Sequence, residues 1–138
     1  MENSIEKEEG KTLSIDFDKL QHICSIDEGV IPVVVQNAEN KEVLIVAYAN
    51  RKALDYTLES KIATFWSTSR NELWIKGETS GNILDVMDIR INCEQNSLLY
   101  LVKLRGTGSC HTRDADGKNR NSCYYRRLTK DGLEFIDE

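Results

Sequence analysis

The run of eight residues from 97 to 104 is the most apolar segment of the chain, and it constrains the fold more than any other feature. Leu98, Leu99, Tyr100, Leu101 and Val102 follow one another without a polar interruption. In an extended chain, successive side chains point to opposite faces, so this run is apolar on both faces. It therefore predicts a central strand with a neighbouring strand on each side.

Other apolar and β-branched segments predict the neighbouring strands. They lie at residues 30–36, 42–48, 63–67, 72–76 and 84–92, and a closing hairpin is expected from 124–128 and 133–136. Asn50 is a suitable N-cap for a short helix at residues 51–60. One face of that helix would carry Ala53, Leu54, Thr57 and Leu58. Together these elements predict a small, strand-rich α+β fold.

Length and charge limit the class of protein. The 138 residues suit one domain, with a flexible, charged lead-in at residues 1–11. A formal net charge of −5 argues against a nucleic-acid binder. No stretch approaches the roughly 18 apolar residues of a membrane span, and the N-terminus lacks a secretory signal. We therefore expect a cytoplasmic protein, in which cysteines stay reduced.

Three cysteines and a histidine form the most distinctive set of polar residues. Cys93 precedes the Ser109-Cys110-His111-Thr112 segment, and Cys123 follows it. Three thiols and an imidazole suit a zinc site with one position open for water. The alternative is that these are scattered core cysteines, because free cysteine is often buried. His22 and Cys24 have no other ligand type nearby, and we interpret both as structural.

A glycine-bracketed loop at residues 77–82 carries hydroxyl side chains. Backbone N–H groups and hydroxyls near a lysine can form an anion site. The alternative is an ordinary hairpin turn. Two nearby cations, Arg70 and Lys76, favour phosphate binding. The residues predicted to recognise phosphate are Ser67, Ser69, Arg70, Lys76, Thr79 and Ser80.

Several segments, in this order, resemble the phosphoribosyl-AMP cyclohydrolase family. They are residues 47–54, 65–70 and 72–81, and the Cys-His-Thr…Ser-Cys-Tyr-Tyr-Arg segment that ends at Arg126. The family consists of hydrolases of histidine biosynthesis, a branch of amino-acid biosynthesis, which add water across the N1–C6 bond of phosphoribosyl-AMP. The resemblance implies this activity on a small nucleotide substrate. It also places Trp74, Gly77 and Glu78 in the substrate and phosphate site.

The resemblance further implies an intertwined homodimer whose zinc is bound by cysteines from both subunits. Carried over residue by residue, these ligands are Cys93, Cys110 and Cys123. His111 would be the catalytic general base or proton shuttle. Zinc lowers the pKa of bound water to about 7, and a histidine can then move protons to the departing nitrogen.

Two departures from the family pattern concern the metal sites. The family surrounds its first zinc cysteine with magnesium-binding aspartates, whereas this chain has Asn92, Glu94 and Asn96 at those positions. Neutral amides bind magnesium much more weakly than carboxylates, so a magnesium cofactor is doubtful. The second departure is an insertion at residues 113–119, whose Asp114 and Asp116 could supply the missing acids.

Three functions therefore stay open on the sequence. The chain is a cyclohydrolase with an altered magnesium site, a zinc hydrolase of the same family that acts on another purine-like nucleotide, or a non-catalytic zinc-binding homologue. A complete set of cysteines with His111 argues against the last, because a closed structural site needs a fourth ligand.

Overall fold

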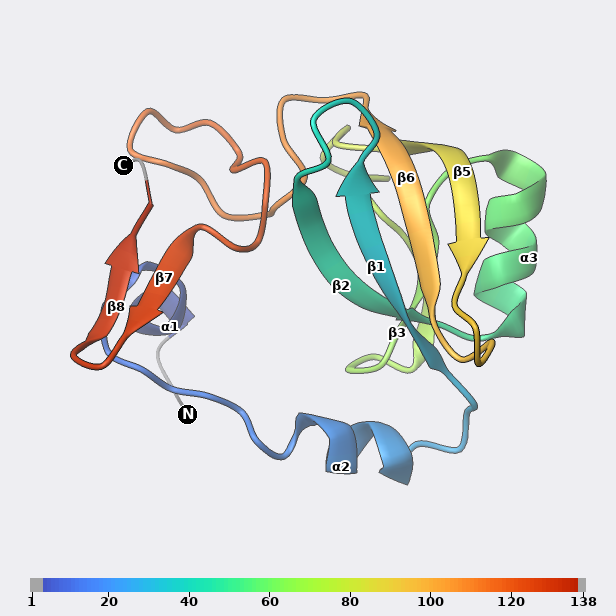
Figure 1. Cartoon of the computed structure of the whole chain (residues 1–138), viewed down its shortest axis with the longest axis horizontal. Coiled ribbons are helices and arrows are strands. Elements are labelled where there is room, and N and C mark those ends of the chain that lie inside the picture. The colour runs from blue at the N-terminus through green and yellow to red at the C-terminus, as the bar shows by residue number, and fades with distance from the viewer. Residues whose placement is uncertain (1–3, 137–138) are drawn as a thin grey trace.

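The computed structural model describes residues 4–136 and is built around a mixed four-stranded sheet in the order β2-β1-β6-β5 (Figure 1). The strands are β1 Ile31–Asn37, β2 Val43–Ala49, β5 Leu84–Ile91 and β6 Leu98–Leu104. β6 pairs in parallel with β1 and antiparallel with β5. The prediction of a central strand at residues 97–104 is therefore confirmed.

A second layer covers one face of this sheet. It consists of helix α3 Arg51–Ser60 and the hairpin of β3 Thr64–Ser67 with β4 Glu72–Ile75. The helix begins as predicted, because the Asn50 side chain accepts a hydrogen bond of 2.9 Å from the Ala53 amide. Leu58 was predicted on the buried face but is exposed. In this short helix only Ala53 and Thr57 are buried, so the face that packs on the core is narrower than the predicted one.

The core lies between these two layers. Phe65 of β3 stacks on Tyr100 of β6 with 5.9 Å between the ring centroids, and Trp74, its cross-strand neighbour on β4, lies at 5.6 Å with a tilted ring. Around these rings the core contains Val33, Val35, Leu44, Ala47, Ala49, Ala53, Ala63, Leu84, Val86, Leu98 and Val102. The core therefore draws on the four-stranded sheet and on its covering layer, and the predicted small α+β class is confirmed.

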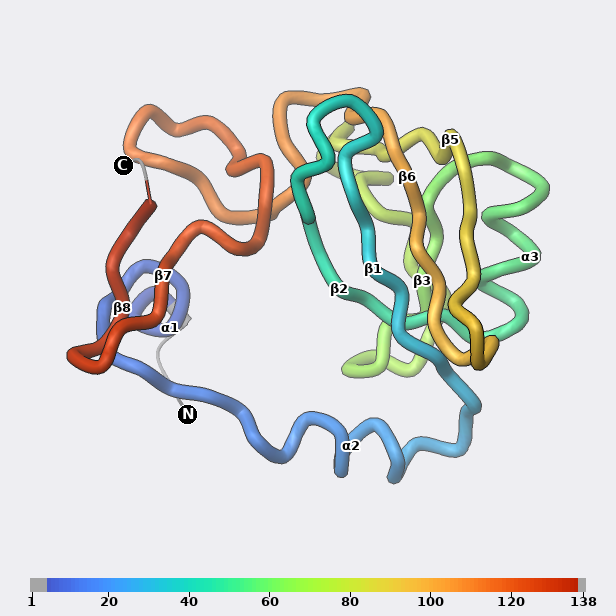
Figure 2. Tube along the Cα trace, in the orientation of Figure 1, coloured from blue at the N-terminus to red at the C-terminus, as the bar shows by residue number. Residues whose placement is uncertain are grey.

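Residues 4–11 and the closing hairpin lie together, apart from the main sheet (Figures 1 and 2). The closing hairpin is present as β7 Arg126–Thr129 and β8 Gly132–Phe135. The N-terminal segment contains helices α1 Ser4–Glu9 and α2 Lys19–Ser25, where the sequence predicted a flexible lead-in as far as residue 11. The Leu133 amide donates a hydrogen bond of 2.9 Å to the Lys11 carbonyl, which ties this segment to the hairpin.

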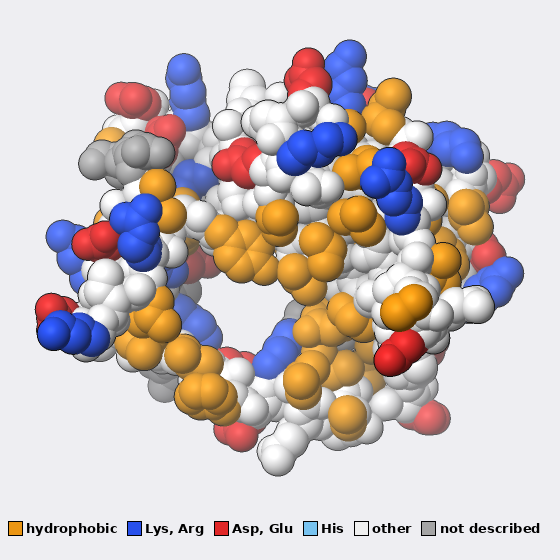
Figure 3. All heavy atoms as spheres, in the orientation of Figure 1, with side chains coloured by type: hydrophobic (Ala, Val, Ile, Leu, Met, Phe, Trp, Pro, Cys, Tyr) orange, Lys and Arg blue, Asp and Glu red, His pale blue; other side chains and the backbone are white. Residues whose placement is uncertain are grey.

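Apolar side chains surround an opening between the main sheet and the region of the chain ends (Figure 3). Five large apolar residues of the N-terminal segment are exposed, among them Phe17 with 84% of its surface accessible. The other four are Ile5, Leu13, Ile15 and Leu20. Within residues 4–136, no helix is long and apolar enough to cross a membrane.

Candidate active site

The cysteine segment forms a compact loop after β6, held by its own backbone. The amides of Ser109 and Cys110 donate to the Arg120 carbonyl at 3.1 and 2.9 Å, and the Arg120 amide donates to the Thr112 carbonyl at 3.0 Å. This pairing requires glycine at position 108, because a Cβ there would lie 2.3 Å from the Asn119 carbonyl oxygen. The loop is therefore rigid at the point where it presents Cys110 and His111.

Two thiols meet in this loop. Cys110 is buried, and its sulfur lies 3.0 Å from the Thr112 hydroxyl. A hydrogen bond from the Cys123 thiol lowers the pKa of Cys110 to about 5, and the same bond raises the pKa of Cys123. The pair thus shares one proton and holds one negative charge at neutral pH.

Lys76 supplies the opposite charge beside the thiols. The residue is 7% exposed, and burial lowers the pKa of its ammonium group, while negative charge on Cys123 and Cys110 opposes that shift. A partly desolvated cation therefore lies within electrostatic reach of both sulfurs.

Cys93 lies at the far end of the central strand. It follows β5 in the turn before β6, whereas Cys110 follows the other end of β6. The seven residues of β6 separate the two ends by about 20 Å, at roughly 3.3 Å per residue. Accordingly, residues 4–136 contain no cluster of three His, Cys, Asp or Glu side chains that could hold a metal ion.

The donor chemistry of Cys110 and Cys123 nonetheless fits zinc. Zinc prefers thiolate ligands, and this pair already contains one thiolate at neutral pH. A single chain supplies two of the three predicted ligands at this point, so Cys93 could complete the site only from a second copy. The alternative of buried core cysteines applies to Cys110 alone, because Cys24, Cys93 and Cys123 are exposed.

A cleft of about 340 Å³ lies next to the thiols. Its walls come from β4, the loop after β4, and the side chain of His111. The lining residues are Arg70, Glu72, Leu73, Trp74, Ile75, Lys76, Gly77, Glu78, Thr79, Ser80 and His111. Seven of the predicted substrate residues thus surround one cleft together with the predicted catalytic histidine. Gly77 adopts a φ of +81°, and a Cβ there would meet the Asn82 carbonyl carbon at 2.3 Å, so the loop needs glycine to turn back.

Ser67 and Ser69 lie outside this cleft. Both line a neighbouring cavity of about 210 Å³ that Trp74 separates from the first. Ser67 is buried, and its hydroxyl accepts hydrogen bonds from the backbone amide and the Nε of Arg70 at 3.3 and 3.4 Å. In this structure Ser67 therefore contacts Arg70, which itself lines the cleft.

The predicted magnesium positions form an exposed turn of mutual hydrogen bonds. The Asn92 Oδ1 accepts from the amides of Asn96 and Ser97 at 2.9 Å each, and the Asn92 Nδ2 donates to the Asn96 Oδ1 at 2.6 Å. The Asn96 Nδ2 in turn donates to the Glu94 Oε2 at 3.1 Å. In this amide turn, the side-chain oxygens that could bind a cation already accept hydrogen bonds from N–H groups.

The insertion at residues 113–119 forms a hairpin of its own. Asp114 accepts hydrogen bonds from the amides of Asp116 and Lys118 at 2.9 and 3.0 Å, and Gly117 turns the chain with a φ of +77°. This hairpin lies beyond the end of β6 opposite the amide turn (Figure 1). Within one chain, Asp114 and Asp116 therefore do not replace the missing acids.

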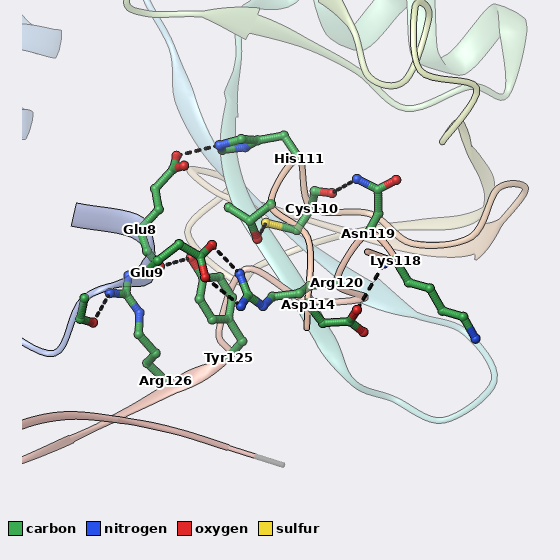
Figure 4. Close-up of polar contacts among 12 residues, drawn as sticks. Glu8, Glu9, Cys110, His111, Asp114, Lys118, Asn119, Arg120, Tyr125 and Arg126 are labelled. Carbon is green, nitrogen blue, oxygen red and sulfur yellow. Dashed lines mark hydrogen bonds and ion pairs between the residues drawn. The ribbon is translucent and has the colours of Figure 1, made fainter. Parts of the chain in front are cut away.

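Two glutamates of α1 reach the site, and neither was predicted from the sequence. Glu8 Oε2 lies 2.6 Å from Nε2 of His111, and Glu9 forms a bidentate ion pair with Arg120 at 2.8 and 2.9 Å (Figure 4). Each contact joins residues more than a hundred positions apart. No local pattern could have indicated either pair.

Comparisons with known proteins agree on one family. The family model described as phosphoribosyl-AMP cyclohydrolase matches residues 45–125. A protein of that name from Chlorobium chlorochromatii is 41% identical over 99% of this chain and 90% of its own length. Two others with the same name, from Archaeoglobus fulgidus and Methanosarcina barkeri, are 48% and 46% identical. They match over 76% and 83% of this chain, and over 91% and 80% of their own lengths.

Proposed function

The chain belongs to the phosphoribosyl-AMP cyclohydrolase family, and we propose that it opens the purine ring of phosphoribosyl-AMP by adding water across the N1–C6 bond, a step of histidine biosynthesis. The observation that carries this proposal is the cleft that brings His111 together with the loop at residues 77–80. The paired thiols of Cys110 and Cys123 lie beside it, within electrostatic reach of Lys76.

Different residues of the cleft would bind the phosphate of such a substrate and transfer its protons. Arg70 and Lys76 supply positive charge for phosphate, and the backbone and hydroxyls of Thr79 and Ser80 supply hydrogen-bond donors. His111 lines the same cleft and can take a proton from the attacking water and deliver one to the departing nitrogen.

Zinc would be held by Cys110 and Cys123 of one subunit and by Cys93 of a second copy. When bound, it would supply a Lewis acid that lowers the pKa of a water molecule to about 7. The separation of Cys93 from the other two thiols supports a site shared between subunits. The apolar opening of Figure 3 supports the homodimer that such a site requires, because a second copy would cover the exposed apolar side chains.

Incubation of purified, zinc-loaded protein with phosphoribosyl-AMP tests the proposal. Ring opening changes the ultraviolet absorption of the purine, so turnover can be followed directly and the product confirmed by its mass. If the substrate is not consumed, the second candidate is a zinc hydrolase acting on another purine-like nucleotide. The amide turn favours that candidate, because it is where the chain departs from the family pattern.

Changing Arg70 to alanine is expected to raise the Michaelis constant about ten-fold, because one charge-assisted hydrogen bond to phosphate contributes about 1.5–3 kcal/mol. Arg51→Ala is the matched control, since Arg51 is an exposed arginine of α3 paired with Asp55. Steady-state kinetics of both variants provide the measurement. An unchanged Michaelis constant for Arg70→Ala would show that the loop is only a turn.

Magnesium is expected to change the turnover of the parent protein by no more than about two-fold, because two of the three side chains in the amide turn are neutral. The variant Asn92→Asp/Glu94→Asp/Asn96→Asp should gain magnesium dependence, since three carboxylates repel one another until a cation joins them. Turnover with magnesium and with chelator, measured for both proteins, gives the comparison. Strong magnesium dependence of the parent would contradict the expectation, and activity that appears only in the variant would support the second candidate.

A further inference from the structure

Helix α1 carries a carboxylate to the catalytic histidine proposed above. The Glu8 Oε2 and the His111 Nε2 are 2.6 Å apart, and within residues 4–136 the His111 ring forms no other hydrogen bond (Figure 4). The His111 side chain is 77% exposed, so little packing restrains it. The contact with Glu8 is therefore the main restraint on the direction of the ring.

A set of contacts behind Glu8 fixes its position. The adjacent Glu9 pairs with Arg120, whose side chain is 5% exposed and whose guanidinium carbon lies 3.9 Å from the centre of the Tyr125 ring. The Tyr125 hydroxyl donates a hydrogen bond of 2.7 Å to the Glu8 carbonyl. The Arg126 side chain donates one of 3.0 Å to the Gly10 carbonyl. The end of α1 is thus docked on the loop that carries His111.

We propose that Glu8 is a positioning residue that acts through His111. A carboxylate accepts hydrogen bonds, so Glu8 accepts one from the Nε2–H group of His111. Nδ1 is then the nitrogen that exchanges protons. The same hydrogen bond holds the ring at the mouth of the cleft, where a poorly oriented group would lose part of its rate contribution. This role rests on the proposed function of His111, but the contact itself can be tested without substrate.

The first experiment reads the ring nitrogens directly. The chain has two histidines, so nitrogen-15 labelling of histidine gives two sets of ring signals, and His22 serves as an internal reference. With the imidazole ring in its neutral form, the parent is expected to show His111 with its proton on Nε2. In Glu8→Ala the His111 shifts should move toward the average of the two tautomers, whereas the His22 shifts should not move. Unchanged His111 shifts in this variant would overturn the proposal.

The second experiment separates positioning from folding. Glu8→Ala is expected to lower kcat about ten-fold, while the Michaelis constant, zinc content and Tm stay unchanged. Glu8→Gln should lower kcat less, because its amide oxygen still accepts a hydrogen bond. Glu6→Gln is the matched control, since Glu6 is an exposed glutamate of the same helix. An unchanged or higher kcat in Glu8→Ala would show that Glu8 does not assist His111. A parent that fails to consume phosphoribosyl-AMP would overturn the proposed function instead, whatever the ring signals show.

Discussion

Replacing Cys110 with serine is expected to leave much less than one zinc per subunit and to abolish measurable turnover. Cys110 is the buried member of the thiol pair and carries its negative charge, so the hydroxyl of serine removes the strongest donor from the site. Cys24→Ser is the matched control, because Cys24 is exposed on α2. Metal analysis after dialysis provides the measurement. Full zinc content in Cys110→Ser would refute the assignment of these ligands.

A mixture of two inactive variants tests whether the site is shared between subunits. Cys93→Ser and Cys110→Ser should each be inactive alone. Coexpressed, they can form a mixed dimer in which one of the two sites receives all three native cysteines. Random pairing then restores about a quarter of the parental activity. If all three ligands came from one chain, every site in the mixture would lack a cysteine, and no activity would return. The mass of the complex in solution gives the subunit count independently.

The second large effect is expected at His111. Changing it to asparagine should lower kcat by about 10²–10⁴-fold, because a positioned group for proton transfer contributes rate factors of that size. His22→Asn is the control, since the His22 ring lies outside the cleft, with its Nε2 3.4 Å from the Thr68 carbonyl in the turn between β3 and β4. Zinc content should stay at the parental level, because His111 is not among the predicted ligands. A kcat of the variant within a few-fold of the parental value would show that His111 is not the catalytic residue.

Much of the fold could be predicted because its signals are local. The apolar runs that became β1, β2 and β6 and the Asn50 cap that begins α3 depend on residues a few positions apart. The grouping of Arg70, Lys76 and the glycine loop is also local, and the cleft contains all of them. Leu58 was misplaced because a helix pattern does not indicate how wide the buried face is.

The candidate site was predictable only where it is continuous in the sequence. Cys110 and His111 are adjacent, and Cys123 returns to them through a hairpin, so their neighbourhood follows from one loop. Asn92, Glu94 and Asn96 were recognised as a departure from the acidic pattern. That their amide groups bond to one another depended on side-chain orientations that the sequence does not specify.

Sequence patterns indicate the family, the order of the strands and of α3 along the chain, and the residue types that are available for zinc and phosphate. That Cys93 lies at the opposite end of β6 from Cys110, and that α1 brings Glu8 to His111, is visible only in the folded chain. The physical reason is the range of the interactions. Strand formation and helix caps depend on residues a few positions apart. The pairing of β1 with β6 and the contact of Glu8 with His111 depend instead on how the completed elements pack, and no local pattern records them.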